Sequence, residues 1–374
     1  MTFKQKILLV HRWLGFVSGP LVFIIALTGA IYAFQMEIED AVHDYRFISK
    51  SEKEQFLPPT EIQKSADAAL PGKHLHAVLY YKEERAAKAI YFSFEDEYYY
   101  TVYVNPYSGE VQKVKDEYTS FFGFILDGHF NLWLPREIGQ PIVASATLVF
   151  FFIVVSGLFL WWPKKKKKKK TKFTIRWSGK WRRRNYDLHT VIGMYASLIA
   201  LIFIVTGLVM GFNWFRNSFY YTISGGESYV DYYAPNSSKV YDSTGSKKDP
   251  LDAAWLKMNE MYPDAYWIEV HPPEVNNSSL AANANPTHGT YYDMRYHYFD
   301  LNTLEELPVK HSWDSGEDRS LADKIMRMNY DIHIGSILGF PGKLLACLVS
   351  LLIASLPVTG FLMWYGRKYK KKKS

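Results

Sequence analysis

The sequence predicts an integral membrane protein: an α-helical bundle of four transmembrane helices, arranged as two parallel repeats that each carry an α+β extracytoplasmic domain. Three observations support this. Four stretches are long and apolar enough to cross a bilayer, basic residues gather at alternate ends of these stretches, and the two halves share motifs in the same order. The mean hydropathy of -0.16 hides the pattern, because it averages very apolar stretches with very polar ones.

Each apolar stretch exceeds the roughly 20 helical residues that a hydrocarbon core requires. The only charged residue among them, Lys343, lies near an end of its stretch. The first stretch is also longer than the apolar run of a signal peptide, about 7–15 residues, so we interpret it as an uncleaved anchor. The stretches are Trp13–Phe34, Ile138–Trp162, Val191–Phe212 and Leu338–Tyr365.

The distribution of charge predicts the orientation of the spans. The N-terminus, the loop between spans two and three and the C-terminal tail carry 22 basic residues and one acid, Asp187, whereas the rest of the chain has 22 basic and 36 acidic residues. By the positive-inside rule, both termini and the loop are cytoplasmic. Because the lysine run 164–170 directly follows a span, we expect anionic lipid, and no nucleic acid, as its partner.

The spans and the charge together predict eight segments. They are transmembrane helix 1 (1–34), extracytoplasmic domain 1 (35–137), transmembrane helix 2 (138–162), a basic cytoplasmic loop (163–188), transmembrane helix 3 (189–212), extracytoplasmic domain 2 (213–337), transmembrane helix 4 (338–365) and a basic cytoplasmic tail (366–374).

The repeat is visible when the halves are set side by side. His11 opens span one and is followed by Thr28-Gly29; His189 opens span three and is followed by Thr206-Gly207, with 18 residues from His to the second Gly in both. Asp127-Gly-His129 precedes span two, and Asp331-Ile-His333 precedes span four. These spans close with Ser156-Gly157 and Thr359-Gly360, 28 and 27 residues after the histidine.

The outer segments also match each other. Each begins with a helix-like stretch, near Pro59–Leu70 and near Asp252–Met261, and continues with alternating aromatic and polar residues. Such alternation predicts strands, so we expect a small antiparallel sheet packed on one helix in each segment. The expected strands are His74–Tyr81, Ala89–Phe94 and Tyr98–Val104 in the first segment, and Tyr266–Val270 and Tyr291–Phe299 in the second.

The repeat places four histidines at two depths of the membrane. His11 and His189 lie at the cytoplasmic ends of their spans, and His129 and His333 lie at the opposite ends. Two neutral imidazoles that face each other suit an iron porphyrin, which takes one axial ligand from each side. We therefore predict that the four histidines are axial ligands of haem iron. Nearby small residues would leave room for a flat macrocycle: Gly15, Ser18, Gly19 and Gly193.

Two other interpretations of the histidines remain open. Interfacial histidines can anchor helix ends in the headgroup layer, and a zinc site is the main chemical rival. Asp127 and Asp331 each lie two residues before a histidine of the outer pair, and we interpret them as partners of the second ring nitrogen or as helix caps.

Three more residues are candidates for contact with an outer cofactor. Arg136 and Arg327 fall near the outer histidines in the sequence and could bind haem propionates through charge-assisted hydrogen bonds. His43 follows span one and is the histidine without a repeat partner that we consider best placed to reach the cofactor.

These motifs resemble the PepSY-associated transmembrane-helix family, often called iron-regulated membrane proteins, whose best understood members are bacterial inner-membrane ferric-siderophore reductases. The resemblance covers nearly the whole chain. It rests on His11-Arg-Trp-Leu-Gly15 and its second copy, on the turn Val104-Asn-Pro-Tyr-Ser-Gly-Glu-Val111 and on the closing Gly-x-x-x-Trp of spans two and four. It implies a four-helix core with two b-type haems, held by His11, His189, His129 and His333, and PepSY-like periplasmic domains.

The resemblance also implies an activity: reduction of a ferric siderophore or related ferric chelate in the periplasm, with release of ferrous iron. The chain has no Gly-rich nucleotide motif, so its electron donor must be separate, in the cytoplasm or the membrane. The alternative function is a cofactor-free PepSY membrane protein that regulates or senses an extracytoplasmic partner. A transporter is disfavoured, because the spans lack charged residues at the midplane.

Overall fold

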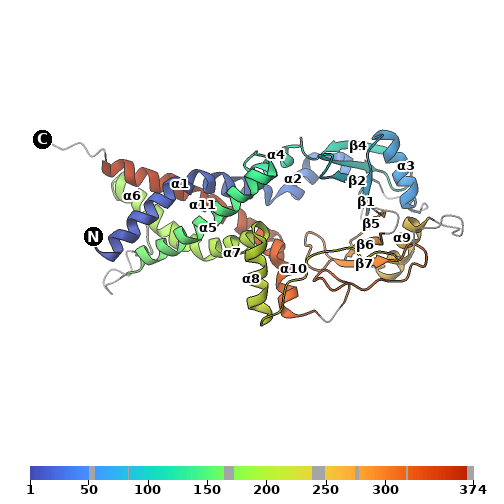
Figure 1. The fold of residues 1–374 in the computed structure, drawn as a ribbon. Helices are drawn as coiled ribbons and strands as arrows, with labels where there is room; N and C mark the ends of the chain where they lie inside the picture. The colour runs from blue at the N-terminus through green and yellow to red at the C-terminus, as the bar shows by residue number, and fades with distance from the viewer. Residues whose placement is uncertain are drawn as a thin grey trace. The chain divides into compact units, whose positions relative to one another are not determined.

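The computed structural model describes residues 1–49, 55–82, 84–163, 172–237, 249–273, 278–316 and 319–368, and the chain forms two compact units (Figure 1). The membrane unit comprises Met1–Gln35, Phe124–Phe219 and Asn329–Ser374. The sheet unit comprises Met36–Gly123 and Tyr220–Met328. Much of the predicted basic loop and tail, namely 164–171 and 369–374, lies outside the described residues.

The four predicted spans are confirmed as helices long and apolar enough to cross a membrane, so the chain is a multi-pass membrane protein. The helices extend beyond the apolar stretches. The first begins at Phe3, because Thr2 and Gln5 form a reciprocal capping box there. The spans are α1 (Phe3–Tyr32), α5 (Arg136–Trp161), the run of α6 (Trp181–Asp187), η4 (Leu188–Ile192) and α7 (Gly193–Gly211), and the run of η5 (Ser336–Leu338) and α11 (Gly339–Lys368).

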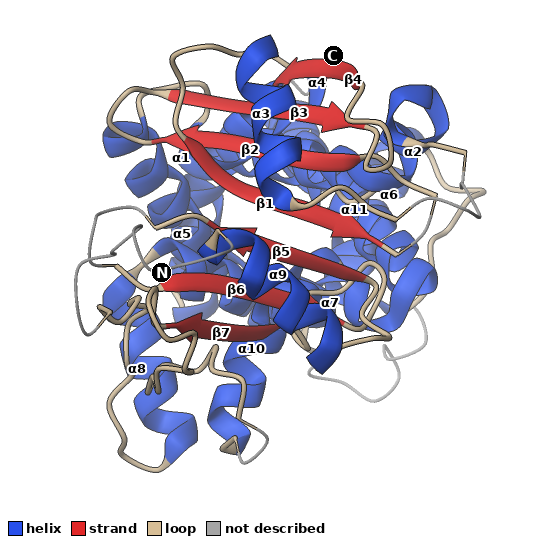
Figure 2. Cartoon of the chain, turned by 90° about the vertical axis from the view of Figure 1, so that its right-hand side faces the viewer, coloured by secondary structure: helices blue, strands red, loops and turns tan. Residues whose placement is uncertain are grey.

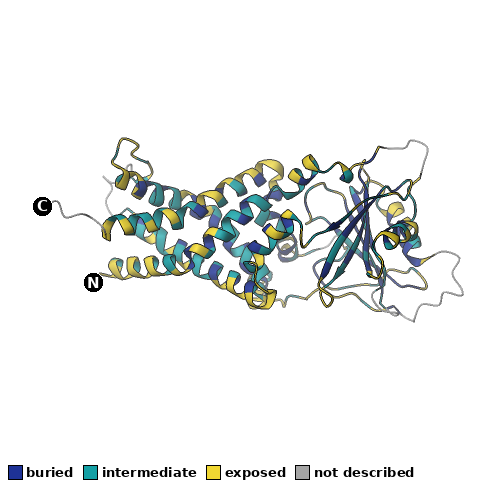
Figure 3. Cartoon of the chain, turned by 90° about the horizontal axis from the view of Figure 1, so that it is seen from above, coloured by how far each residue is buried: buried dark blue, intermediate teal, exposed yellow. Residues whose placement is uncertain are grey.

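The four membrane helices pack in a ring, in which α1 and α7 each contact both α5 and α11. Side chains buried together between them are small or branched, such as Val22, Ala200 and Ile353. Large apolar side chains, including Phe152 and Leu198, remain exposed, and exposed positions run along the helices in Figure 3. An apolar surface of this extent is expected where lipid covers the protein.

Two shorter helices precede α5 and α11, in segments that the sequence analysis assigned to the outer domains without predicting a helix there. They are α4 (Phe121–Asn131) and α10 (Leu321–Ile334). Leu132 and Trp133 adopt left-handed backbone conformations, with φ of 56° and 58°, and end α4. Gly335, with φ of 82°, ends α10, and a Cβ there would lie 2.4 Å from the carbonyl oxygen of Gly342. Only glycine allows both the turn and this close approach.

The sheet unit is built on one seven-stranded antiparallel sheet with the order β4-β3-β2-β1-β5-β6-β7 (Figure 2). Strands from the two halves of the chain meet where β1 pairs with β5, and Val78 lies opposite Val270 there. The strands are β1 (Leu75–Tyr81), β2 (Ala87–Ser93), β3 (Tyr98–Val104), β4 (Val111–Asp116), β5 (Trp267–His271), β6 (Leu280–Asn285) and β7 (Arg295–Phe299).

This sheet corrects the expectation of two separate small sheets. Pairing of β1 with β5 satisfies backbone groups that two separate sheets would leave open at their edges. Two strands were missed: β4 (VQKVKD) is mostly polar, and β6 (LAANAN) lacks the β-branched and aromatic residues that favour strands. The strand expected at Tyr291–Phe299 begins only at Arg295.

The two expected helices are confirmed as α3 (Pro59–Ala69) and α9 (Pro250–Met261), which lie on the same face of the sheet (Figure 2). They bury Ile62 and Met258 in the main core of the unit. The backbone N–H and the hydroxyl of Thr60 donate to Asp252 at 2.9 and 2.7 Å, which joins the two helices. The remaining helices of the described residues are α2 (Gln35–Val42), η1 (Asp44–Arg46) and α8 (Asn213–Ser224).

An ionic network ties the start of the sheet unit together. Glu39 is buried and accepts hydrogen bonds from Arg46 Nη1 at 2.8 Å and Lys115 Nζ at 2.6 Å. Asp40 accepts from Arg46 Nε at 2.7 Å and from Arg85 Nη2 at 2.6 Å. Burial alone would raise the pKa of Asp40, but the hydrogen bonds and positive charges of Arg85 and Arg46 outweigh it and lower that pKa.

We expect Asp40→Asn to lower the free energy of unfolding at pH 7 by about 3 kcal/mol, because it leaves two largely buried guanidinium groups short of a partner. The folded-state pKa of Asp40 lies below its unfolded value, so this stabilisation is present above about pH 4 and is lost as pH falls through the folded pKa. Thermal unfolding of the full chain in detergent at several pH values tests this. Asp264→Asn is the control, because the Asp264 carboxylate is 97% exposed in its ion pair with Lys82; equal effects of both changes would contradict the prediction.

Candidate functional site

The four histidines singled out by the repeat all lie in the membrane unit, each on a different helical segment. His11 lies on α1, His129 on α4, His189 on η4 and His333 on α10. The segment η4 is a single π-helical turn, an irregularity that often marks a functional position. The histidines thus come from both the spans and the short helices that precede them.

The structure brings together the pairs expected from depth. The ring centroids of His129 and His333 are 6.3 Å apart, with an interplanar angle of 61°. His11 and His189 lie near enough to interact electrostatically. Whether either pair binds iron remains a prediction from the sequence.

A hydroxyl group from another helix contacts the Nδ1 atom of every one of these rings. Ser156 Oγ lies 2.9 Å from Nδ1 of His11, and Thr359 Oγ1 lies 3.0 Å from Nδ1 of His189. Thr206 Oγ1 lies 2.8 Å from Nδ1 of His333.

His129 has two such contacts. Its Nδ1 atom lies 2.9 Å from the carbonyl oxygen of Ile25 and 3.3 Å from Thr28 Oγ1. In the described part of the chain, no hydrogen bond reaches Nε2 of any of the four rings. Contacts at Nδ1 fix the orientation of an imidazole and leave Nε2 as its available ligand atom.

A glycine directly follows each of these hydroxyl residues, and the imidazole packs against it. A Cβ added to Gly29 would lie 2.9 Å from Cε1 of His129. The corresponding distances to Cε1 are 3.3 Å from Gly157 to His11, 3.4 Å from Gly207 to His333 and 3.2 Å from Gly360 to His189. The Ser/Thr-Gly dipeptide therefore supplies both a hydrogen-bond partner and the space for the ring.

These contacts are reciprocal within each half of the chain. His11 of α1 rests on α5, while His129, just before α5, rests on α1. In the second half, His189 rests on α11, and His333, just before α11, rests on α7. Each half therefore fixes its own two histidines, one near each end of its helix pair.

A cavity of about 280 Å³ lies among the membrane helices beside His129 and His333, and both imidazoles line it. Its wall is largely apolar and includes small residues from several helices, such as Gly29, Gly207 and Ala346. Small side chains let a flat ligand approach the helix backbones closely, as an iron porphyrin requires.

The small residues expected beside the other pair have different surroundings. A Cβ on Gly15 would meet no atom within 4 Å, so this position does leave space. A Cβ on Gly19 would lie 3.3 Å from Pro357 Cβ, so Gly19 instead allows close packing of α1 and α11. Ser18 is buried and donates to the carbonyl oxygen of Leu14 in its own helix.

The expected role of Asp127 and Asp331 as partners of the ring nitrogens is not what the Nδ1 contacts indicate. Asp127 accepts a hydrogen bond from Asn131 at 2.9 Å. Asp331 is fully buried and accepts from Ser336 Oγ at 2.6 Å, beyond the end of α10. The hydroxyl groups already described contact the histidines instead.

The candidates for contact with an outer cofactor are dispersed. Arg136 is exposed at the first position of α5. Arg327 is buried within the sheet unit and donates to backbone carbonyl oxygens, so it is not the free propionate ligand that the sequence suggested. His43 stacks on Tyr45, with ring centroids 5.0 Å apart, in the sheet unit.

Within the described ranges, no group of three or more His, Cys, Asp or Glu side chains is placed to hold a metal ion. A structural zinc site takes four such ligands, whereas an iron porphyrin needs only one or two from the protein. The paired imidazoles therefore fit a porphyrin better than zinc.

Sequence reasoning missed the function of the Ser/Thr-Gly dipeptides. It used them only as markers of the repeat, although a hydroxyl residue followed by glycine occurs in every span. That recurrence was the available signal, since no other polar pair is repeated at all four positions.

Comparison with known proteins identifies a matching family. The family model described as the PepSY-associated TM region matches residues 8–367. A search of curated proteins found no match to the chain.

We expect Thr206→Val, which removes the hydroxyl at His333 while keeping the side-chain shape, to weaken haem binding at that site about 10- to 100-fold. Haem titration of the purified chain, followed by absorbance, measures this. Thr147→Val is the matched control, because Thr147 lines the same cavity but donates to Val143 of its own helix. Equal haem affinity in both variants would contradict the assigned role of Thr206.

Proposed function

Because the chain belongs to the family defined by the PepSY-associated TM region, we propose that it is a di-haem membrane oxidoreductase. It passes electrons across the bacterial inner membrane to a ferric siderophore or related ferric chelate in the periplasm and thereby releases ferrous iron. One observation supports this proposal. Each of the four histidines has its Nδ1 atom in contact with a hydroxyl group, and its ring packs against the glycine that follows the hydroxyl residue.

The chain's own residues would hold, orient and shield two b-type haems. His129 and His333 would supply the ligands at one depth, and His11 and His189 those at the other. The hydroxyl contacts keep each Nδ1 atom occupied, so that Nε2 is presented to iron. When bound, haem b supplies reversible one-electron chemistry at its iron.

Water exclusion is the second contribution of the membrane unit. The cavity beside His129 and His333 is lined mainly by apolar residues from several helices, including Phe150 and Phe203. A largely apolar wall lowers the local dielectric and, with the axial ligands, tunes the redox potential of an iron centre.

The charge distribution supports a fixed orientation in the membrane. We place both termini and the lysine-rich loop in the cytoplasm, because these segments hold 22 basic residues and one acid. The pair His11–His189 would then lie near the cytoplasmic face, next to a separate electron donor in the cytoplasm or membrane. The pair His129–His333 would lie near the periplasmic face. Anionic lipid would bind the lysine run.

The arrangement of the sheet supports a duplicated ancestor with two PepSY-like outer modules. On either side of the β1–β5 junction the strand order is the same, with β2 and β3 on one side and β6 and β7 on the other. One helix from each half, α3 and α9, covers the same face. We infer that the two parallel repeats are joined both in the bundle and in the sheet.

The proposed reaction transfers one electron per iron. The donor loses one electron, and Fe(III) in the docked chelate becomes Fe(II). Reduction weakens the attraction between iron and the hard oxygen ligands of the chelator, because Fe(II) carries less charge. The iron then leaves the chelate as ferrous ion.

We expect His11→Ala and His333→Ala each to remove about half of the bound haem, because each variant takes one ligand from a different pair. Absorbance of the purified variants, normalised to protein, measures the haem content. His288→Ala changes an exposed histidine of the sheet unit and should leave the haem content unchanged. If neither ligand variant loses haem, the assignment of the pairs is wrong.

We also expect the dithionite-reduced chain, freed of excess reductant, to reduce ferric chelates with one Fe(II) formed per haem oxidised. Capture of Fe(II) by ferrozine and the loss of the reduced haem spectrum measure the two sides of this balance. His129→Ala/His333→Ala should slow the reaction at least about tenfold, because the site nearest the periplasm loses its ligands. If the haem stays reduced after mixing with every ferric chelate tested, the proposed activity is wrong, although the haem sites could still be correct in their assignment.

A further inference from the structure

A second cavity, of about 260 Å³, lies wholly within the sheet unit and is unusually basic. Four of its seven lining residues are cationic and one is acidic, although the chain outside its three basic segments has 36 acidic and only 22 basic residues. The lining residues are Tyr292, Asp293, Arg295, Arg319, Lys324, Arg327 and Met328. A local excess of positive charge in an acidic surrounding indicates a site for an anion.

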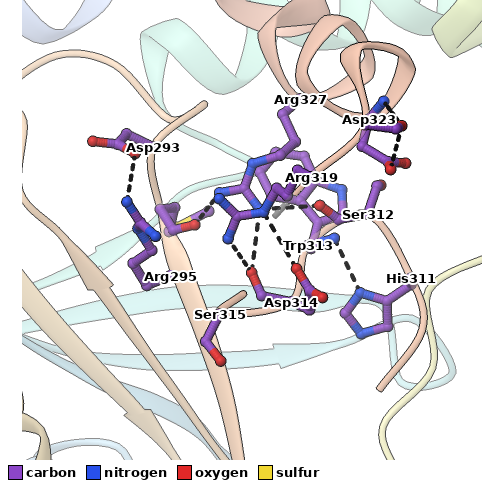
Figure 4. Close-up of polar contacts among 12 residues, drawn as sticks. Asp293, Arg295, His311, Ser312, Trp313, Asp314, Ser315, Arg319, Asp323 and Arg327 are labelled. Atoms are coloured by element: carbon purple, nitrogen blue, oxygen red, sulfur yellow. Dashed lines mark hydrogen bonds and ion pairs between the residues drawn. The ribbon is translucent and has the colours of Figure 1, made fainter. Parts of the chain in front are cut away.

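Arg327 carries a buried positive charge beside this cavity and is only 2% exposed. Its guanidinium donates to the backbone carbonyl oxygens of Tyr292 at 2.8 Å and Ser312 at 3.1 Å, and lies over the Trp313 ring at 4.8 Å (Figure 4). Among the described residues it forms no ion pair. Its hydrogen bonds are therefore largely satisfied, but no carboxylate of the described residues lies at ion-pair distance from it.

The other charges around the cavity do not cancel this excess. Arg319 pairs with Asp314 at 3.2 Å, and Arg295 pairs with Asp293 at 3.4 Å. Lys324 is exposed on α10. Among the residues of this region that the structure describes, four basic side chains thus stand against three acids, Asp293, Asp314 and Asp323.

Asp323, the third acid of this region that the structure describes, has hydrogen-bond partners outside the cavity, and the pKa of Arg327 reflects the positive charges around it. Asp323 accepts hydrogen bonds from Tyr220 at 3.0 Å and Ser320 at 2.6 Å. Burial, together with the positive charges of Arg319 and Arg295, lowers the pKa of Arg327 to about 10. A bound anion would relieve this repulsion.

The size and chemistry of the cavity narrow the class of anion. One water molecule needs only about 10–15 Å³ of such space, so the cavity can hold a ligand much larger than a single water or a simple inorganic ion. Guanidinium groups match the planar oxygens of carboxylates in paired hydrogen bonds. Several cationic groups around one cavity suit a ligand with more than one carboxylate.

We propose that this cavity binds a small polycarboxylate anion, and that the anion is the chelating shell of the ferric substrate. The binding of a polycarboxylate is argued from the cavity alone, whereas the identity of that anion as the chelating shell of the substrate rests on the proposed function. The preferred acceptor is then a negatively charged iron chelate of the carboxylate type rather than a neutral hydroxamate. Its reduction is the same one-electron step already described.

Calorimetric titration of the purified full-length chain in detergent tests the binding. The probes are citrate, gallium(III) citrate as a chelate that is not reduced, inorganic phosphate and a neutral ferric trihydroxamate. We expect citrate or gallium citrate to bind at least about tenfold more tightly than phosphate or the trihydroxamate, and the affinity to fall as salt is raised. Equal affinity for phosphate would overturn the polycarboxylate class.

Variants connect the binding to this cavity. Lys324→Gln alone and together with Arg295→Gln should weaken citrate binding, the double variant at least about tenfold. Lys64→Gln removes the same charge from a 77% exposed residue of the sheet unit, on α3, and should leave affinity unchanged. Wild-type affinity in both cavity variants would overturn the proposal. Lys324→Gln, at an exposed side chain, keeps the test valid if the double variant unfolds.

Absorbance of the same samples separates the two proposals and the two sources of carboxylate. Loss of haem from the cavity variants would mean that these cations hold haem propionates, and would overturn a free anion as the ligand. A colourless chain that binds citrate through Lys324 and Arg295 would refute the proposed function and leave the anion site intact. A chain that binds haem but has no affinity for citrate would refute the anion site and leave the proposed function intact.

Discussion

A hydrogen bond between a histidine ring and a hydroxyl group of a neighbouring helix is the interaction on which the membrane unit depends. It occurs four times, at Ser156, Thr28, Thr206 and Thr359, and each time a glycine beneath the ring makes room for it. A bulkier residue in place of the glycine would push the ring away from its partner. Because each contact joins two helices of the same half, it fixes helix register and imidazole orientation together.

The two halves are coupled in two different ways. In the membrane unit, two helix contacts join the halves: α1 packs on α11, and α5 packs on α7. In the sheet unit, β1 and β5 join the halves through backbone hydrogen bonds. Backbone pairing depends little on side-chain identity, whereas the helix contacts depend on small residues such as Gly19, which lies against Pro357. The continuous sheet would therefore tolerate divergence of the outer sequences better than the bundle would.

Sequence patterns predicted what depends on local periodicity and composition. The four spans, the helices α3 and α9 and the pairing of His129 with His333 all follow from apolar length, alternation and repetition. The junction of β1 with β5 could not be predicted, because edge pairing between distant segments leaves no local signal. The separation of α10 from α11 depends on Gly335 and its tight approach to Gly342, a tertiary contact. The same holds for the buried Arg327, whose partners are backbone carbonyl groups.

The proposed function requires that the paired imidazoles present Nε2 to iron, and the haem content of the wild-type chain tests this requirement most directly. The full chain, expressed with ample haem and purified in detergent, would be assayed for haem and protein together with its oxidised and dithionite-reduced spectra. We predict two b-type haems per chain, with a Soret band that shifts on reduction. A folded chain that absorbs only through its tryptophans and tyrosines would contradict the proposal that the paired histidines bind haem.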